Sequence, residues 1–319
     1  MANPVTSILN PKGDYVFLYY VDKKQRLALD YIPVDRSQNV LSYAAQGTLE
    51  GDHVNNQSIA AVYFHGMPVV FGQLEIVKVS GEITTTKRVL AQLSPIVKAV
   101  ANLESPDDTK LDERYNALAA INSTKQDYVW CYFLKNTAKE GAAPKMMLEE
   151  VSIFGNEVQI HHYSEIPDDL QPDSTTRLAA LYIDQTHREV YYQRKGDDNS
   201  IYCYRIGNKS KPTPIADTGL AMKSTPLAVT RSVEGHVCLY YLSKPAGSDP
   251  IIQRVTRNKG TMEWAPSAGI MTGLSDKAVS ETQLAVTQVI RNNKLENVVT
   301  FIHESEQKYR PARDDGQIE

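Results

Sequence analysis

The chain has 319 residues, of which 42% are hydrophobic and 23% charged, and its formal net charge is −4. A chain of this length can bury an ordinary core in one large or two small domains. The charge balance, 34 Lys and Arg against 38 Asp and Glu, excludes a basic surface for nucleic acid or anionic lipid. The longest apolar runs fall well short of the roughly 18 residues that a membrane-spanning helix needs. The first residues lack the pattern of a secretory signal, so we expect a cytoplasmic protein with no nucleic-acid partner and no membrane partner.

Cysteine and tyrosine usage adds two observations. Cys131, Cys203 and Cys238 each lie inside an apolar or aromatic run, which favours reduced, buried thiols over disulfides. Tyrosine is in excess, with 18 Tyr against 6 Phe and 2 Trp.

A pair of strands recurs along the chain. The first strand of each pair is short, and in five copies a Leu or Ile is followed by Ala; the second strand carries an aromatic or branched run. The copies begin near residues 5, 59, 118, 178, 227 and 284, roughly 50–60 residues apart, a period typical of propellers and repeat arrays. Gly, Asp and Asn residues between the runs supply the turns. The pattern predicts an all-β chain that forms a six-bladed β-propeller with a central tunnel, as a single domain over residues 1–319.

The same pattern indicates where each strand lies. Blades crowd together at the axis of a propeller, so the strand that contains the small Ala residues is predicted to be innermost. The aromatic pairs of the second strand are predicted to pack one blade against the next, which would account for the tyrosine excess.

Four segments depart from the repeat. Residues 94–103 begin with Ser and Pro, which favours a short helix, with a strand as the alternative. Asp107-Asp108 and residues 168–173 have the composition of solvated acidic loops. The charged tail over residues 310–319 is predicted to be frayed.

One repeat resembles a known family. Residues 178–204, LAALYIDQTHREVYYQRKGDDNSIYCY, resemble a blade of the fungal fucose-specific lectins, and this likeness implies a six-bladed ring with sugar sites between blades. The sugar-binding residues of the family do not carry over. Its arginine falls on Glu189 here, and its glutamate falls on Cys203. The stacking Trp is also missing, because Trp130 and Trp264 are the only tryptophans in the chain.

A lectin-like propeller without these sugar sites resembles a second group, the hetero-Diels–Alderases of fungal tropolone sesquiterpenoid biosynthesis. That likeness implies a cofactor-independent pericyclase that joins a tropolone quinone methide to a humulene-type terpene. Its partners would be a small-molecule polyketide and a terpene. Lectin relatives are often dimers, so a homodimer is a further expectation. The alternatives are a fucose-type lectin with degenerate sites and a propeller that binds only other proteins.

Aligned inner strands place a column of polar residues four positions after the conserved Leu or Ile. The column contains Tyr63, Asn122, Tyr182, Arg231 and Gln288, and the counterpart in the first repeat is Asn10 or Leu9, because the register there is ambiguous. Equivalent positions lie at one height around a propeller, so the column predicts a polar collar at one mouth of the tunnel. The alternative is a hydrated mouth without a ligand.

If the collar is a site, its residue types suit a ligand with a polar head and an apolar body. Arg231 could bind vicinal oxygens in a bidentate manner. Tyr63 and His65 are the other candidate catalytic residues, with His65 as a general acid on the same strand face as Tyr63. Asn10, Asn122, Tyr182 and Gln288 are the candidate substrate-binding residues. The histidines show no metal-ligand spacing, so no metal site is predicted.

Overall fold

The structure is a computed structural model, and it describes most of the chain. The described residues are 4–22, 24–35, 41–44, 53–80, 83–100, 117–136, 145–196, 198–207, 211–232, 234–244, 249–261, 263–269, 282–302 and 309–314. Within them the chain is nearly all β, as predicted, and the single helical element is the 3₁₀ turn Asp168–Leu170. No helix in these residues has the length and apolar character needed to cross a membrane.

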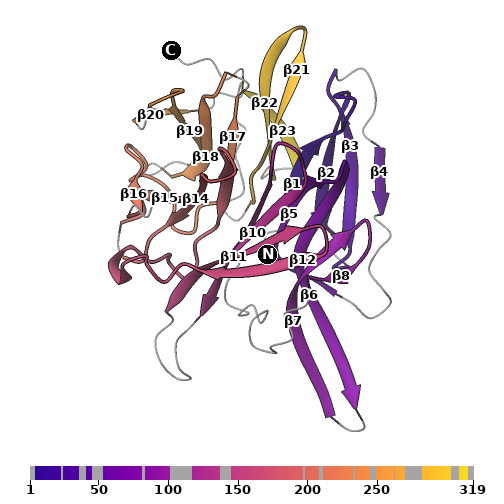
Figure 1. Ribbon diagram of the computed structural model, residues 1–319. Helices are drawn as coiled ribbons and strands as arrows, with labels where there is room; N and C mark the ends of the chain where they lie inside the picture. Colours follow the sequence, from indigo (N-terminus) through magenta and orange to yellow (C-terminus); the bar gives the residue numbers. More distant parts are fainter. Residues whose placement is uncertain are drawn as a thin grey trace.

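The strands form six antiparallel sheets, which are the six blades of a β-propeller (Figure 1). Blades 1 and 2 comprise β1 (Val5–Leu9), β2 (Tyr15–Val21), β3 (Leu27–Pro33), β4 (Leu41–Ala44), and β5 (His53–Phe64), β6 (Met67–Ser80), β7 (Ile83–Ser94), β8 (Lys98–Ala99). Blades 3 and 4 comprise β9 (Leu118–Asn122), β10 (Tyr128–Asn136), β11 (Met146–Phe154), β12 (Glu157–His162), and β13 (Ala179–Tyr182), β14 (Arg188–Gln193), β15 (Ile201–Ile206), β16 (Thr213–Pro214). Blades 5 and 6 comprise β17 (Leu227–Arg231), β18 (Val237–Ser243), β19 (Ile251–Arg257), β20 (Trp264–Gly269), and β21 (Ala285–Arg291), β22 (Lys294–Ile302), β23 (Tyr309–Asp314). The long β6–β7 hairpin extends beyond the ring (Figure 1).

The first strand of each blade lies innermost, as the small residues predict. Each inner strand contacts the next around the ring, and β21 of blade 6 contacts β1 of blade 1. They surround a central cavity of about 180 Å³, whose lining includes Ala61, Ala120 and Ala180. Larger side chains at these positions would prevent the close approach of six strands to one axis.

The core lies between blades rather than at the axis. Hydrophobic clusters join each blade to its neighbour, and the cluster between blades 3 and 4 includes Tyr132, Tyr192 and Leu148. The tyrosine pairs of the second strands are fully buried, which confirms their predicted packing role: Tyr132, Tyr191, Tyr192, Tyr240 and Tyr241. Each buried ring removes a large apolar area from water, worth roughly 1.5–3 kcal/mol for a large side chain. All three cysteines are also buried and free, as predicted.

Blades 1 and 6 close the ring through side chains. The backbone N–H of Val5 donates to Gln283 Oε1 at 3.1 Å, and the hydroxyls of Ser7 and Thr287 are hydrogen-bonded. Arg313 on β23 donates to the carbonyl oxygen of Val34 at 2.7 Å. In the described residues each blade is built from one continuous stretch of chain.

Two expectations from the sequence were wrong in the described residues. The segment that begins at Ser94 does not form the favoured helix; the strand given as the alternative is correct, because β8 (Lys98–Ala99) pairs antiparallel with β7 and completes blade 2. Val100 is buried, and its N–H donates to the carbonyl of Leu90, so apolar burial against the sheet outweighs the capping signal. Residues 101–103 and Asp107-Asp108 lie outside the described residues.

The tail is also ordered further than expected. Residues 309–314 form β23, the outer strand described for blade 6. Arg313 makes an ion pair with Glu296 at 2.8 Å, and Asp314 makes one with Arg254. Glu296 lies in the same sheet and Arg254 lies on β19 of blade 5, so these charges are paired within and between blades, which explains why a charged sequence can form a strand here. Residues 315–319 lie outside the described residues.

Candidate functional site

The predicted collar residues do not form one site. Asn122, Tyr182 and Arg231 end β9, β13 and β17, and Tyr63 lies one residue before the end of β5, whereas Gln288 lies in the middle of β21. None of the predicted collar residues is among those that line the central cavity. Their side chains therefore do not converge on the axis.

Most of the collar side chains bind within the protein. The Tyr63 hydroxyl donates to the carbonyl of Leu9 in blade 1, and Tyr182 stacks on Trp130 with 5.7 Å between ring centroids. The remaining amides bind residues close in sequence: Asn10 binds Asp14 and Tyr15, Asn122 binds the carbonyl of Ser123, and Gln288 binds Asn297. They cap turns and join strands.

His65 does not lie on the strand face assigned to it. β5 ends at Phe64, and His65 occupies the following turn with φ of 49°. Its N–H donates to the carbonyl of Gln126 in blade 3, and its side chain is exposed. Because His65 lies in a turn and not in the strand, the alternation of side chains that placed it on the same face as Tyr63 does not apply to it.

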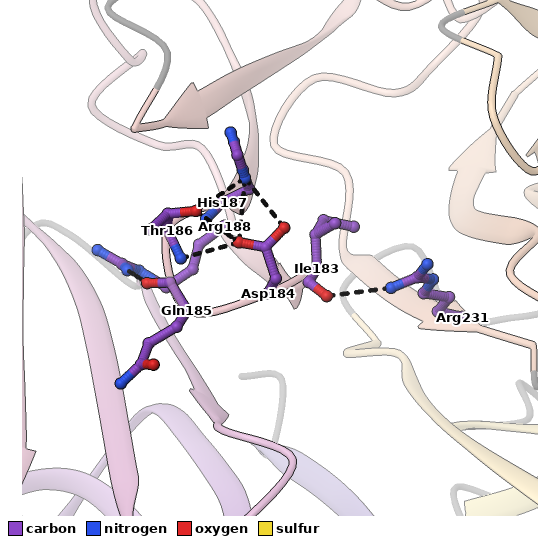
Figure 2. Close-up of polar contacts among 7 residues, drawn as sticks. All are labelled: Ile183, Asp184, Gln185, Thr186, His187, Arg188 and Arg231. Carbon is purple, nitrogen blue, oxygen red and sulfur yellow. Dashed lines mark hydrogen bonds and ion pairs between the residues drawn. The ribbon is translucent and has the colours of Figure 1, made fainter.

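Arg231, one of the predicted residues, lines a pocket. We call this the rim pocket; it lies between blades 4 and 5 and has a volume of about 300 Å³. Its apolar wall includes Ile183 and Val237, and its charged wall carries four arginines and one glutamate: Arg188, Arg205, Arg231, Arg257 and Glu189. Figure 2 shows Arg231 reaching from β17 to the loop between β13 and β14, where Nη1 donates to the carbonyl oxygen of Ile183 at 3.2 Å.

Glu189 neutralises two of the arginines in the rim pocket. Arg257 donates to both of its carboxylate oxygens, at 2.8 and 2.7 Å, and Arg205 donates to one of them at 3.0 Å. The hydroxyl of Tyr191 donates to the other oxygen. The carboxylate is thus buried with four donors, the condition under which a buried charge is tolerated.

Arg188 also borders the rim pocket, but its ion pair, with Glu150, lies on the other side of the same blade. Its guanidinium binds both oxygens of Glu150, at 3.2 and 3.1 Å, and donates to the hydroxyl of Tyr132. It also lies 4.7 Å from the ring centroid of Trp130, just as Arg257 lies 5.2 Å from that of Trp264. A larger cavity of about 470 Å³ adjoins Arg188 and Glu150 between blades 3 and 4, but its arginine is already paired.

Sequence reasoning missed this pair of clusters. The signal was present as two adjacent charged residues, Arg188 and Glu189, at the start of an otherwise apolar strand. Because side chains alternate along a strand, the two point to opposite neighbours. The register pairs Glu189 with Arg205 across the sheet, while the partners Glu150 and Arg257 come from blades 3 and 5.

The Glu189 cluster predicts how stability depends on pH. Burial alone would raise its pKa, but hydrogen bonds and charge from Arg257, with Tyr191 and Arg205, lower the pKa below the ordinary 4.5. A lowered carboxylate pKa stabilises the folded state above pH 4.5, and this contribution is lost as pH falls through the folded value. We expect the free energy of unfolding, measured with urea, to fall steeply below about pH 4.5. A free energy that stays constant from pH 7 to pH 3 would contradict this assignment.

The comparisons with known proteins agree with the fold. No protein-family model matches the chain. The wall-associated proteinase of Coccidioides posadasii is 27% identical over 297 residues, which cover 88% of this chain and 89% of that protein. The protein of the same name from Coccidioides immitis is 27% identical over 269 residues, which cover 81% of this chain and 80% of that protein.

The solved structures that match include fungal lectins. The Aleuria aurantia lectin, a six-bladed β-propeller that recognises fucose, matches with a TM-score of 0.69 at 13% identity, covering 99% of this chain and 92% of that one. AofleA from Arthrobotrys oligospora matches with a TM-score of 0.62 at 11% identity, covering 97% and 86%. These likenesses show that the chain has the lectin-type propeller fold.

Proposed function

We propose that this protein binds a small planar organic ligand with adjacent oxygens, of the tropolone type, in the rim pocket. The observation that carries the proposal is the state of Arg231. Among the described residues it has no carboxylate partner, whereas the other three arginines of the pocket are paired with Glu150 or Glu189. Its side chain is exposed and makes one hydrogen bond, to a loop carbonyl. Several N–H groups of its planar, permanently charged guanidinium therefore remain free to donate hydrogen bonds to ligand oxygens.

The size and walls of the pocket suit such a ligand. A volume of about 300 Å³ accommodates a single substituted ring and is at the lower end of the range of small-molecule sites. Ile183 and Val237 can cover the faces of the ring while Arg231 binds its oxygens. Selectivity would then come from the bidentate geometry, which an isolated hydroxyl does not satisfy.

The finer proposal is that the bound ligand reacts as the heterodiene of a hetero-Diels–Alder cyclisation with a humulene-type alkene. This reaction needs no protein nucleophile. Holding two partners in reacting geometry can supply about 7–11 kcal/mol, and a hydrogen bond from Arg231 to the heterodiene oxygen would favour the charge that develops there. With a tropolone filling the pocket, the terpene would bind at the solvent-exposed edge of the pocket.

A fucose-type lectin is the second candidate, and the fold likeness over nearly the whole chain favours it. The position of the rim pocket between blades also fits that class. Against it, Trp130 and Trp264 are each covered by an arginine of this chain. The aromatic faces on which a sugar would stack are thus occupied.

Replacing Arg231 by Gln tests the proposal. We expect the affinity for tropolone, measured by isothermal titration calorimetry, to fall about 10- to 100-fold, because a charge-assisted bidentate hydrogen bond is lost. The melting temperature should hardly change, because Arg231 makes a single hydrogen bond within the protein. The matched control is Arg26→Gln, which removes an exposed arginine paired with Asp22 in blade 1 and should leave affinity unaltered.

Two outcomes would contradict the proposal. Absence of tropolone binding by the unmodified protein would remove it outright. Saturable fucose binding that persists in the Arg231→Gln variant would instead support the lectin. For the finer proposal, incubation with a hydroxymethyl-tropolone and humulenol should give one enantiomer of the adduct. A racemic product formed at the background rate would rule out the cyclase.

A further inference from the structure

A histidine lies on the same loop that holds Arg231. The loop between β13 and β14 presents the carbonyl of Ile183 to Arg231, and it ends at His187, which also lines the rim pocket. The imidazole Nδ1 lies 3.0 Å from each carboxylate oxygen of Asp184, and Figure 2 shows the ring standing over that carboxylate. The loop therefore carries an imidazole, and through the carbonyl of Ile183 it also holds the guanidinium of Arg231, which can bind a ligand oxygen.

Asp184 fixes which imidazole nitrogen is free to exchange a proton. Although burial acts to raise it, hydrogen bonds from Thr186 and His187 lower the pKa of Asp184 to about 2. The carboxylate is ionised at neutral pH, so Nδ1–H donates to it and Nε2 is left to exchange a proton.

The other charges around His187 do not compete for this role. The side chain of His187 is 45% exposed and lines the rim pocket. The charged groups that face it across the pocket are Arg188, Glu189, Arg205, Arg231 and Arg257. Glu189 is already bound by Arg205 and Arg257, and Arg188 by Glu150. In the described residues Asp184 is the one carboxylate that contacts His187.

We propose that His187 is the proton-transfer residue of the rim pocket, acting at Nε2 on a ligand whose oxygens Arg231 binds. The inference rests on the proposed function and extends it to the step before cyclisation. With a hydroxymethyl-tropolone, imidazolium Nε2–H gives its proton to the side-chain hydroxyl. The carbon–oxygen bond then breaks with its electron pair remaining on oxygen, and water leaves. The ring hydroxyl returns a proton to Nε2, which gives the quinone methide and regenerates the imidazolium without any oxidant or reductant.

The dehydration step can be observed without the terpene. Reversible loss of water exchanges the hydroxymethyl oxygen with solvent, so incubation of the full-length protein and a hydroxymethyl-tropolone in ¹⁸O-water should label the ligand. We expect His187→Gln to slow this exchange at least about 100-fold, with tropolone affinity changed less than about threefold. His161→Gln is the matched control, because His161 borders the other cavity, between blades 3 and 4.

Asp184→Asn separates the positioning role from a structural one. Loss of the carboxylate that holds Nδ1 should slow the exchange at saturating ligand about 10-fold or more while leaving tropolone affinity unchanged, a separation that a merely structural role would not give.

The outcomes are distinguishable. If His187→Gln binds tropolone and exchanges oxygen as fast as the unmodified protein, or if the unmodified protein binds tropolone but exchanges no oxygen, the inference is overturned and the proposed binding function stands. If the unmodified protein does not bind tropolone, the proposed function fails, and the inference fails with it.

Discussion

Replacing Glu189 by Gln is expected to lower the free energy of unfolding by about 3–5 kcal/mol, the usual cost of removing one partner from a buried ion pair. The variant keeps the size of the side chain but removes the charge that neutralises Arg257, whose side chain is 6% exposed, and Arg205. The hydroxyl of Tyr191 would also lose its charged acceptor. Urea unfolding monitored by circular dichroism at pH 7 measures the change.

Two further variants identify the cause of that loss. Asp168→Asn breaks an ion pair with Lys145 in which both side chains are more than half exposed, and it should cost about 0.5 kcal/mol or less. Glu189→Leu combined with Arg257→Met removes both charges and should recover part of the stability, because apolar pairs can replace buried ion pairs. A Glu189→Gln variant as stable as the unmodified protein would show that the cluster does not hold blades 4 and 5 together.

Gly207→Ala is expected to cost at least about 2 kcal/mol of stability and to weaken ligand binding at the rim pocket. Gly207 follows β15 with φ of +99°, which side chains rarely adopt, and an added Cβ would lie 1.9 Å from the backbone oxygen of Thr186. That oxygen belongs to the loop that positions His187 and contacts Arg231. Relieving the clash must move either the loop or the end of β15, so both the melting temperature and tropolone affinity should fall.

Gly155→Ala is the matched control for this substitution. Gly155 also has positive φ, +58°, but an added Cβ would meet nothing within 4 Å. The control should therefore cost only the conformational strain of about 1–2 kcal/mol, with ligand affinity unchanged. Equal effects of the two variants on affinity would show that the loop does not depend on Gly207.

The fold could be predicted because it rests on local, repeated information. The alternation of apolar and polar residues and the small residues of the inner strands recur from one blade to the next. One clear repeat therefore allows the strands of the less regular repeats to be identified. The structure of the segment after Ser94 was harder to predict. Its helix-capping signal is local, whereas the burial of Val100 depends on the rest of blade 2.

The candidate site was only partly predictable. The collar column included Arg231, which lines the rim pocket, but alternation does not say whether an amide binds a ligand or its own turn, as Asn10 does. The partners of Glu189 lie 16 and 68 residues away, on strands whose register one sequence does not give. His187 was passed over because its role depends on Asp184 in a loop, where spacing carries little information.

The way in which blades 1 and 6 meet bears on the order of assembly. Each sheet can form from one continuous stretch of chain, whereas the contact from Val5 to Gln283 joins residues 278 positions apart. Bringing such distant segments together costs about 5 kcal/mol of chain entropy. With no strand shared between these two blades in the described residues, the hydrophobic clusters between them, a few side-chain hydrogen bonds and the contact of β1 with β21 must offset that cost. The ring is therefore expected to close last, after the blades exist as units.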